Sequence, residues 1–381
     1  YLFSLFLPLS LVASCLIYPV EQLNIKRYTD IAKRTFGGFK GEKIVVTGSF
    51  GKTGVKNILE AILKEQYNVV SSPKNYNTPM GMYLSSKLIK PETEVFIAEA
   101  GARRRGDIKE ICNIVKPTKG IITAIGIMHL ATFKRYEAIY NTKKELADCL
   151  PDGSFLILNA DNAGTNKIAQ EIKNRLVITA SCRGGGDVNV IVKSETLQGT
   201  LCEISVFGED FTVTTPLLGT HNAQNIALAL ACAKTLNVAN DAAARAIAAL
   251  KAPEHRMQLL DGYNGITIID DSYNCNFEGA KEALRILNTV NDGRRKVLFT
   301  QGIIELGREQ AETNAALGAL AAAAADAVIL TGVNAHHIEK GLRDKDFGGE
   351  IHTYKSFKLA QAALPEVLKA GDLLLIQNDL P

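Results

Sequence analysis

The chain has 381 residues, of which 46% are hydrophobic and 22% charged, a balance typical of globular proteins with a sizeable core. Its 43 basic and 40 acidic residues leave a net charge of +3, which gives no reason to expect nucleic acid as a partner. The seven cysteines are scattered and form no C-x-x-C pair, which favours reduced thiols in a cytosolic compartment over a zinc site or a disulfide framework. The length predicts two or three domains.

The first twenty residues, Tyr1 to Val20, carry no charge and are mostly Leu, Phe, Val or Ile. An apolar run of this length just crosses a hydrocarbon core of about 30 Å. Basic residues follow it, which places the rest of the chain on the cytoplasmic face of the inner or plasma membrane. We therefore expect an apolar membrane-anchor helix and a connector over residues 1–40; a signal peptide or a buried helix are the alternatives.

Residues 41–257 alternate apolar strands with helical patterns, as mostly parallel sheets do. A buried strand, Lys43 to Val46, leads through a glycine-containing turn into a helix whose apolar residues repeat at i, i+3 and i+4. Further strands are expected at 95–98, 120–123 and 154–158. Between Val188 and Leu218 polar and apolar residues alternate, which indicates a small antiparallel addition to the sheet.

Two helices, 222–236 and 241–250, precede a second series of strands. These strands are expected at 266–269, 296–299, 327–330 and 373–376, and the alanine run 319–325 is read as a helix before the third of them. We therefore expect an α/β protein with a central P-loop-type domain over 41–257 and a C-terminal Rossmann-like domain over 258–381. Because the chain stops at Pro381, we interpret the second domain as truncated.

The strongest chemical motif is Thr47 to Thr53, TGSFGKT, between a strand and a helix. Glycines let backbone N–H groups wrap phosphates, and the start of the helix adds positive potential. Lys52 would neutralise the β- and γ-phosphates of ATP, and Thr53 would offer an oxygen to Mg²⁺. Val46 replaces the first glycine of the usual pattern, and an ordinary strand-turn-helix is the alternative. The expected ATP-binding residues here are Gly48, Ser49, Phe50, Gly51, Lys52 and Thr53.

This loop and the motifs after it resemble the Mur ligase family, in particular its D-alanyl-D-alanine-adding ligases. The further motifs occur in the family's order at residues 75–81, 99–108, 123–130, 143–146, 158–161, 219–225, 270–276 and 305–307. The resemblance implies an ATP-dependent acid–amino-acid ligase that activates a carboxylate as an acyl phosphate and lets an amine displace phosphate. It also implies a role in building peptidoglycan for the cell wall.

The resemblance further implies which residues hold metal. Glu99 ends a strand near the phosphate loop, where a carboxylate suits a hard cation such as Mg²⁺. His129 would bind a second Mg²⁺, and Lys143 would be carbamylated by CO₂ to help hold that ion. Lys144 is the competing choice, and a solvated helix face is the alternative for both lysines. Lys52, Lys143 and His129 are thus the expected catalytic residues.

The nucleotide site completes the resemblance. Asn222 and Asn225 correspond to asparagines on the adenine side, Arg256 to an arginine facing the nucleotide, and Asp271 to a residue near the ribose. Arg256 and Asp271 flank the predicted domain boundary, so they could report domain closure over ATP. The expected partners are small molecules, namely a muramoyl peptide and an amino acid or D-alanyl-D-alanine, and the expected state is a monomer.

Two departures from the family concern the substrates. The phosphate loop begins at Gly48, which leaves no room before it for the family's UDP-binding domain. Unless that domain was cut from this fragment, we expect the acceptor to bind differently and hypothesise a membrane-bound muramoyl peptide. The late K-G-S segment is missing from 375–381. The remaining alternatives are a folylpolyglutamate-type ligase, an enzyme amidating lipid-linked peptidoglycan and a membrane-tethered scaffold without turnover.

Overall fold

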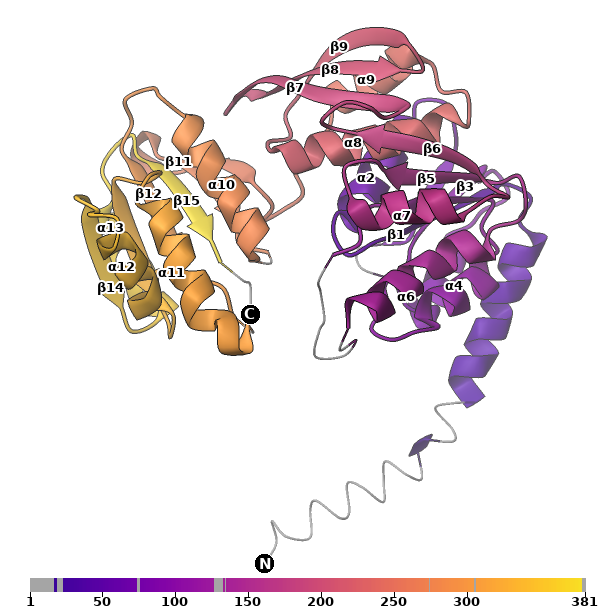
Figure 1. Cartoon of the computed structure of the whole chain (residues 1–381), viewed down its shortest axis with the longest axis horizontal. Helices are drawn as coiled ribbons and strands as arrows, with labels where there is room; N and C mark the ends of the chain where they lie inside the picture. The colour runs from indigo at the N-terminus through magenta and orange to yellow at the C-terminus, as the bar shows by residue number, and fades with distance from the viewer. Residues whose placement is uncertain are drawn as a thin grey trace, which may run out of the picture. The chain divides into compact units, whose positions relative to one another are not determined.

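The computed structural model describes residues 17–18, 23–73, 76–126, 133, 135–273, 275–304 and 306–378 (Figure 1). These residues form two compact units, each described by itself below. The first unit comprises Tyr1–Ile191, Cys202–Val213 and His221–Ala248, and the second comprises Val192–Leu201, Thr214–Thr220 and Ala249–Pro381.

Most of the expected membrane anchor, Tyr1 to Val20, lies outside the described residues. Within the described part of the chain, no helix is both long and apolar enough to cross a membrane. Residues 23–38 are helical, and Ala32 and Phe36 from this helix are buried in the core of the first unit. The Phe36 ring lies 4.8 Å from that of Phe96, so the connector after the apolar run packs onto the domain.

The first unit contains most of a nine-stranded sheet in the order β2-β3-β1-β4-β5-β6-β7-β8-β9. The end of β7, the start of β8 and the end of β9 belong to the second unit. Neighbours from β2 to β7 pair in parallel. Two-residue connections join β7, β8 and β9, so these three are antiparallel, as the alternation after Val188 predicts. The strands are β1 Glu42–Thr47, β2 Val69–Ser71, β3 Val95–Glu99, β4 Lys119–Ile122, β5 Phe155–Asn159, β6 Leu176–Ser181, β7 Val188–Thr196, β8 Gly199–Val206 and β9 Glu209–Thr215.

Helices flank this sheet, and the extent to which a helix is buried accounts for its amino-acid composition. The alanine-rich α8 is buried at every position from Ala223 to Ala233, where small side chains allow close packing. Helix α4 packs against α6, and α2 against α9. The helices are α2 Lys52–Leu63, α3 Pro79–Ser86, α4 Asp107–Val115, α6 Tyr136–Cys149, α7 Ala163–Glu171, α8 Thr220–Lys234 and α9 Asn240–Ala248.

The second unit has a six-stranded sheet in the order β10-β11-β15-β12-β13-β14. Only β10 is antiparallel to its neighbour; the other pairs are parallel, as a Rossmann-like domain requires. The strands are β10 Gln258–Asp261, β11 Thr267–Asp271, β12 Lys296–Thr300, β13 Ala327–Thr331, β14 Glu350–Tyr354 and β15 Leu373–Gln377. The helices are α10 Phe277–Thr289, α11 Gln310–Ala321, α12 Ala335–Arg343 and α13 Phe357–Val367.

The helix expected in the alanine run is α11, although it ends at Ala321, inside that run. It packs closely on α12 because each helix places a glycine against the backbone of the other. A Cβ at Gly318 would lie 2.1 Å from the carbonyl oxygen of Ile338, and one at Gly341 would lie 1.9 Å from that of Ala315. Larger residues at either glycine would force the two helices apart.

Candidate active site

The expected phosphate loop joins β1 to α2, and its shape depends on glycine. Gly51, the residue before α2, has a φ of 77°, a left-handed conformation that costs other residues about 1–2 kcal/mol. Gly48 has a φ of 149°, and a Cβ there would lie 2.0 Å from Thr123 Oγ1. The backbone at these two positions therefore cannot take a side chain without moving.

The N-terminus of α2 is suited to an anion. No side chain caps it, and its first turn contains no acidic residue. The N–H groups of the first turn and the helix dipole therefore both favour phosphate at this point. Lys52 lies over the loop, where Nζ donates hydrogen bonds to the carbonyl oxygens of Gly48 at 3.0 Å and Ser49 at 3.4 Å.

The segment after β4 holds the loop from one side. Ser49 N donates to the carbonyl oxygen of Ala124 at 2.8 Å. Ser49 Oγ donates to the carbonyl oxygen of Gly126, and Gly126 N donates back to Ser49 Oγ, both at 3.0 Å. Thr123 Oγ1 donates to the carbonyl oxygen of Phe50. The phosphate loop is thus anchored to a second strand end rather than standing free.

Thr53 and Glu99 are hydrogen-bonded to each other beside this loop. Thr53 Oγ1 donates a hydrogen bond of 2.8 Å to Glu99 Oε2, and Asn77 Nδ2 donates one of 3.3 Å to Glu99 Oε1. Glu99 is 2% exposed. A buried carboxylate and a hydroxyl next to a phosphate-binding helix start are donors that Mg²⁺ prefers, so this pair fits the predicted ion.

Lys143 lies in the interior of α6, with 4% of its surface exposed. Burial, together with the positive charge of Lys52, lowers the pKa of its ammonium group to about 7. The negative charges of Asp107, Glu145 and Glu99 act in the opposite direction. Near neutral pH much of this amine is therefore uncharged.

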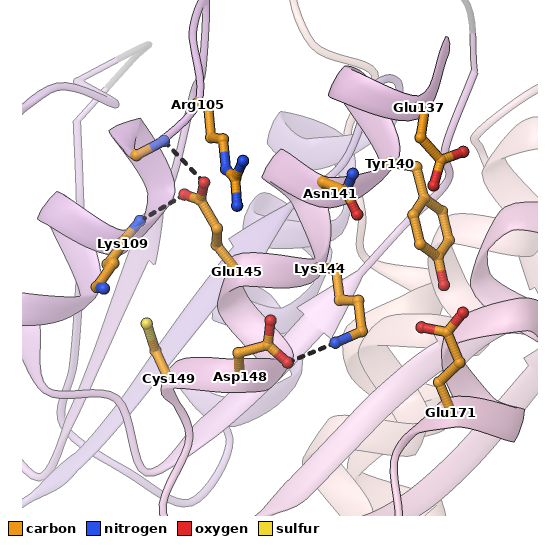
Figure 2. Close-up of a pocket in the computed structure, with 11 residues that line it drawn as sticks. Arg105, Lys109, Glu137, Tyr140, Asn141, Lys144, Glu145, Asp148, Cys149 and Glu171 are labelled. Carbon is orange, nitrogen blue, oxygen red and sulfur yellow. Dashed lines mark hydrogen bonds and ion pairs between the residues drawn. The ribbon is translucent and has the colours of Figure 1, made fainter.

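The side chain of the next residue, Lys144, lines an open pocket of about 610 Å³ (Figure 2). There Lys144 Nζ forms an ion pair of 2.7 Å with Asp148. Glu145, also in the pocket, accepts hydrogen bonds from Gly106 N at 2.7 Å and Lys109 N at 3.0 Å at the start of α4 (Figure 2). Among the described residues, none of the phosphate loop lines this pocket.

Helix α8 brings Asn225 to the phosphate loop. A Cβ built at Gly51 would lie 2.7 Å from Asn225 Oδ1, and one at Gly54 would lie 2.7 Å from Asn225 Nδ2. Asn225 Nδ2 donates to Asn222 Oδ1 at 3.5 Å, so the two predicted asparagines are in contact. The glycine at position 54 leaves the space that Asn225 occupies.

Arg256 and Asp271 belong to the second unit, where they lie near each other. The Arg256 guanidinium lies 4.4 Å from the centre of the Tyr273 ring. Burial raises the pKa of Asp271 to about 6, although a hydrogen bond from the Met257 backbone and the Arg256 charge act to lower it.

His129 lies outside the described residues. Asn276, by contrast, caps α10 by accepting a hydrogen bond of 2.9 Å from Gly279 N, a structural role.

Sequence reasoning did not single out Asn77, although its side chain holds Glu99. It lies in the 75–81 motif, so its position there was the available signal. Lys56 and Ser72, which lie behind Glu99, were also missed. The only feature of the sequence that pointed to this pair was a lysine within the apolar pattern of α2.

Two sequence-family models match the chain. The Mur ligase middle domain matches residues 46–233, and the Mur ligase glutamate ligase domain matches residues 255–377. The chain is 26% identical over 339 residues to UDP-N-acetylmuramoyl-tripeptide–D-alanyl-D-alanine ligase of Bacillus subtilis, covering 88% of this chain and 73% of that protein. It is 29% identical over 337 residues to the Synechocystis ligase of the same name, covering 88% and 71%.

Solved structures agree with these matches. The MurF ligase from Thermotoga maritima in complex with ADP superposes with a TM-score of 0.81 at 25% identity, covering 93% of this chain and 80% of that one. A pseudomurein peptide ligase type C from Methanothermus fervidus gives 0.68 at 19% identity, covering 89% and 76%, a likeness of fold.

Proposed function

The chain belongs to the Mur ligase family of ATP-dependent peptide ligases, and we propose that it joins D-alanyl-D-alanine to the free carboxylate of a muramoyl peptide. The observation that carries this choice of substrates is the match, over 88% of the chain, to ligases named for that reaction. The Thr53–Glu99 pair beside the phosphate loop supports the chemistry.

The reaction needs two bond exchanges. A carboxylate oxygen of the acceptor attacks the γ-phosphorus of ATP, the bond from that phosphorus to the ADP oxygen breaks, and an acyl phosphate forms. The amine of the dipeptide then attacks the acyl carbon, phosphate leaves, and the nitrogen loses a proton. Lys52 and the N–H groups at the start of α2 would hold the phosphates in line and neutralise the charge that develops.

Thr53 and Glu99 are the residues that would hold Mg²⁺, which when bound neutralises the β- and γ-phosphate oxygens. Lys143 is the proposed carbamylation site. CO₂ reacts with an uncharged amine, and the buried Lys143 supplies one near neutral pH, whereas Lys144 is engaged with Asp148. The carbamate would give α6 a negatively charged oxygen ligand, with His129 proposed as its partner.

The nucleotide base and ribose are assigned to further residues. We propose Asn222 and Asn225 for the adenine side, with Asn225 fixed beside Gly51 and Gly54. Arg256 and Asp271 are proposed to face the nucleotide from the C-terminal domain. We also retain, as proposals, the domain limits 41–257 and 258–381. Over residues 1–40 we retain an apolar anchor helix, formed by the first twenty residues, and its connector, which puts the ligase at the cytoplasmic face of the membrane.

The test is product formation by the purified protein with ATP, a UDP-linked or lipid-linked muramoyl tripeptide and D-alanyl-D-alanine. We expect ADP release to require both the acceptor and the dipeptide, and mass spectrometry to find the acceptor enlarged by one D-alanyl-D-alanine. If D-alanyl-D-alanine gives no product while L-alanine, D-glutamate or a diamino acid does, the proposed amine substrate is wrong.

A further inference from the structure

Lys56 is buried in the first unit directly behind the Thr53–Glu99 pair. It lies one turn after Thr53 on α2 and is 2% exposed, among the apolar residues that α2 buries. Removing a lysine from water is costly unless its ammonium group finds partners. A lysine retained at such a position therefore needs an explanation from its contacts.

The ammonium group of Lys56 holds the main chain next to Glu99. Lys56 Nζ donates a hydrogen bond of 2.6 Å to the carbonyl oxygen of Ser72. Ser72 is fully buried, and its Oγ accepts a hydrogen bond of 3.0 Å from Glu99 N. Ser72 N also donates to the carbonyl oxygen of Ile97 at 2.8 Å, on the same strand as Glu99.

The same segment reaches the carboxylate of Glu99. Ser72 starts the connection from β2 to α3, and this connection carries Asn77, whose Nδ2 donates to Glu99 Oε1 at 3.3 Å. The carbonyl oxygen of Asn77 accepts from Gly101 N at 3.1 Å. Ser72 and Asn77 therefore contact both the backbone N–H and the carboxylate of Glu99.

We propose that Lys56 is a positioning residue for the metal site: by holding the backbone of Ser72 it fixes the Ser72 hydroxyl that accepts from Glu99 N, and so orients Glu99 toward Thr53. This inference rests on the proposed role of Glu99 as a Mg²⁺ ligand. Residues that orient metal ligands typically contribute about 10- to 100-fold to metal affinity.

The test is ADP affinity, measured by calorimetry with the full chain in EDTA and in Mg²⁺, for wild type and Lys56→Met. In EDTA we expect both proteins to bind ADP with the same affinity. The factor by which Mg²⁺ increases ADP affinity should be about tenfold smaller in Lys56→Met than in wild type. Removing a cation near Glu99 would by charge alone strengthen Mg²⁺ binding, so a loss reports positioning. Equal weakening in both conditions, no change, or tighter binding in Mg²⁺ would each overturn the inference.

Lys64→Met is the matched control, because Lys64 follows the same helix, is 55% exposed and pairs with Glu60 at 2.6 Å. It should bind ADP as wild type does in both conditions. If Lys56→Met does not fold, the same measurement is made on Ser72→Ala, which removes only the oxygen that accepts from Glu99 N. We expect this variant also to lose ADP affinity in Mg²⁺ and not in EDTA. Unchanged ADP affinity in Mg²⁺ would refute the inference. Should Mg²⁺ fail to strengthen ADP binding by wild type, or Glu99→Gln leave that gain intact, the proposed metal site itself is wrong.

Discussion

Thr53 Oγ1 donates a hydrogen bond of 2.8 Å to Glu99 Oε2, joining residues 46 positions apart. The contact follows from the sheet: β1 and β3 are parallel neighbours, with Val46 opposite Glu99, so their carboxyl ends meet at one edge. Ligands of open α/β sheets bind at this edge. The strand order thereby places a phosphate-binding helix start and a buried carboxylate side by side.

The first prediction concerns the phosphate loop. Lys52→Ala should lower kcat for ADP release by about 10²- to 10³-fold, because the lysine supplies charge to the transferring phosphoryl group. Its melting temperature should stay near that of wild type, because the side chain is half-buried and donates to loop carbonyl oxygens rather than filling the core. Lys64→Ala, on an exposed position, is the control. Retention of most of the turnover in Lys52→Ala would refute the assigned loop.

The second prediction separates the two lysines of α6. Lys143→Ala should be nearly inactive and partly rescued by acetate, which can supply the lost carboxylate oxygens. Lys144→Ala should keep wild-type turnover, because its ion pair with Asp148 lies in the pocket of Figure 2. The measurement is the turnover of both variants with and without acetate. An active Lys143→Ala beside an inactive Lys144→Ala would reverse the assignment.

The third prediction uses two glycines with the same backbone angle. Gly51 has a φ of 77° and Gly153 one of 76°, so alanine at either should cost about 1–2 kcal/mol of stability. Only at Gly51 would the new Cβ approach Asn225 Oδ1, at 2.7 Å. ADP affinity should therefore fall at least tenfold in Gly51→Ala and stay unchanged in Gly153→Ala. Equal ADP affinities in Gly51→Ala and Gly153→Ala would contradict the assignment of the loop around Gly51 to nucleotide binding.

The fourth prediction is a pH dependence of stability. The folded pKa of Asp271, about 6, exceeds its ordinary value of 3.8, so the folded state holds its proton more tightly. Stability is therefore lost as pH rises from about 4 to 6, and the loss is complete above 6. Asp271→Asn should raise the free energy of unfolding by about 1–2 kcal/mol at pH 8, allowing for partial exposure, and leave it unchanged near pH 3.

The check is thermal unfolding of wild type and Asp271→Asn at both pH values. Asp261→Asn, on the exposed end of β10, is the control and should behave as wild type at each pH. A variant that is less stable at pH 8 would show that the ionised carboxylate contributes to folding, the opposite of the stated sign.

Local patterns were enough for much of the fold. The strand from Lys43 to Val46, the glycine turn and the apolar stripe of α2 are each contained in one short segment, so period and glycine placement predicted them. The edge strands β2, β10 and β14 were missed, because β2 and β10 are 3 and 4 residues long and β14 lacks a buried face. The inner strand β6 was missed as well.

The site was predicted less completely, for a physical reason. Motifs identified Lys52, Thr53 and Glu99 one by one, but the contacts that hold Glu99 depend on residues 22 and 27 positions away, Asn77 and Ser72. Such contacts follow from sheet order, which no single segment encodes. Spacing to Glu145 favoured Lys143 over Lys144, but the sequence did not show which of the two is buried; in the structure Lys143 is.

The most direct test of the account follows an oxygen atom. The acceptor carboxylate is labelled with ¹⁸O, the enzyme is supplied with ATP and D-alanyl-D-alanine, and the released phosphate is examined by ³¹P NMR. Formation and aminolysis of an acyl phosphate predict one ¹⁸O in each phosphate released and one amide bond for each ADP. Unlabelled phosphate, or ADP released without amide, would contradict it.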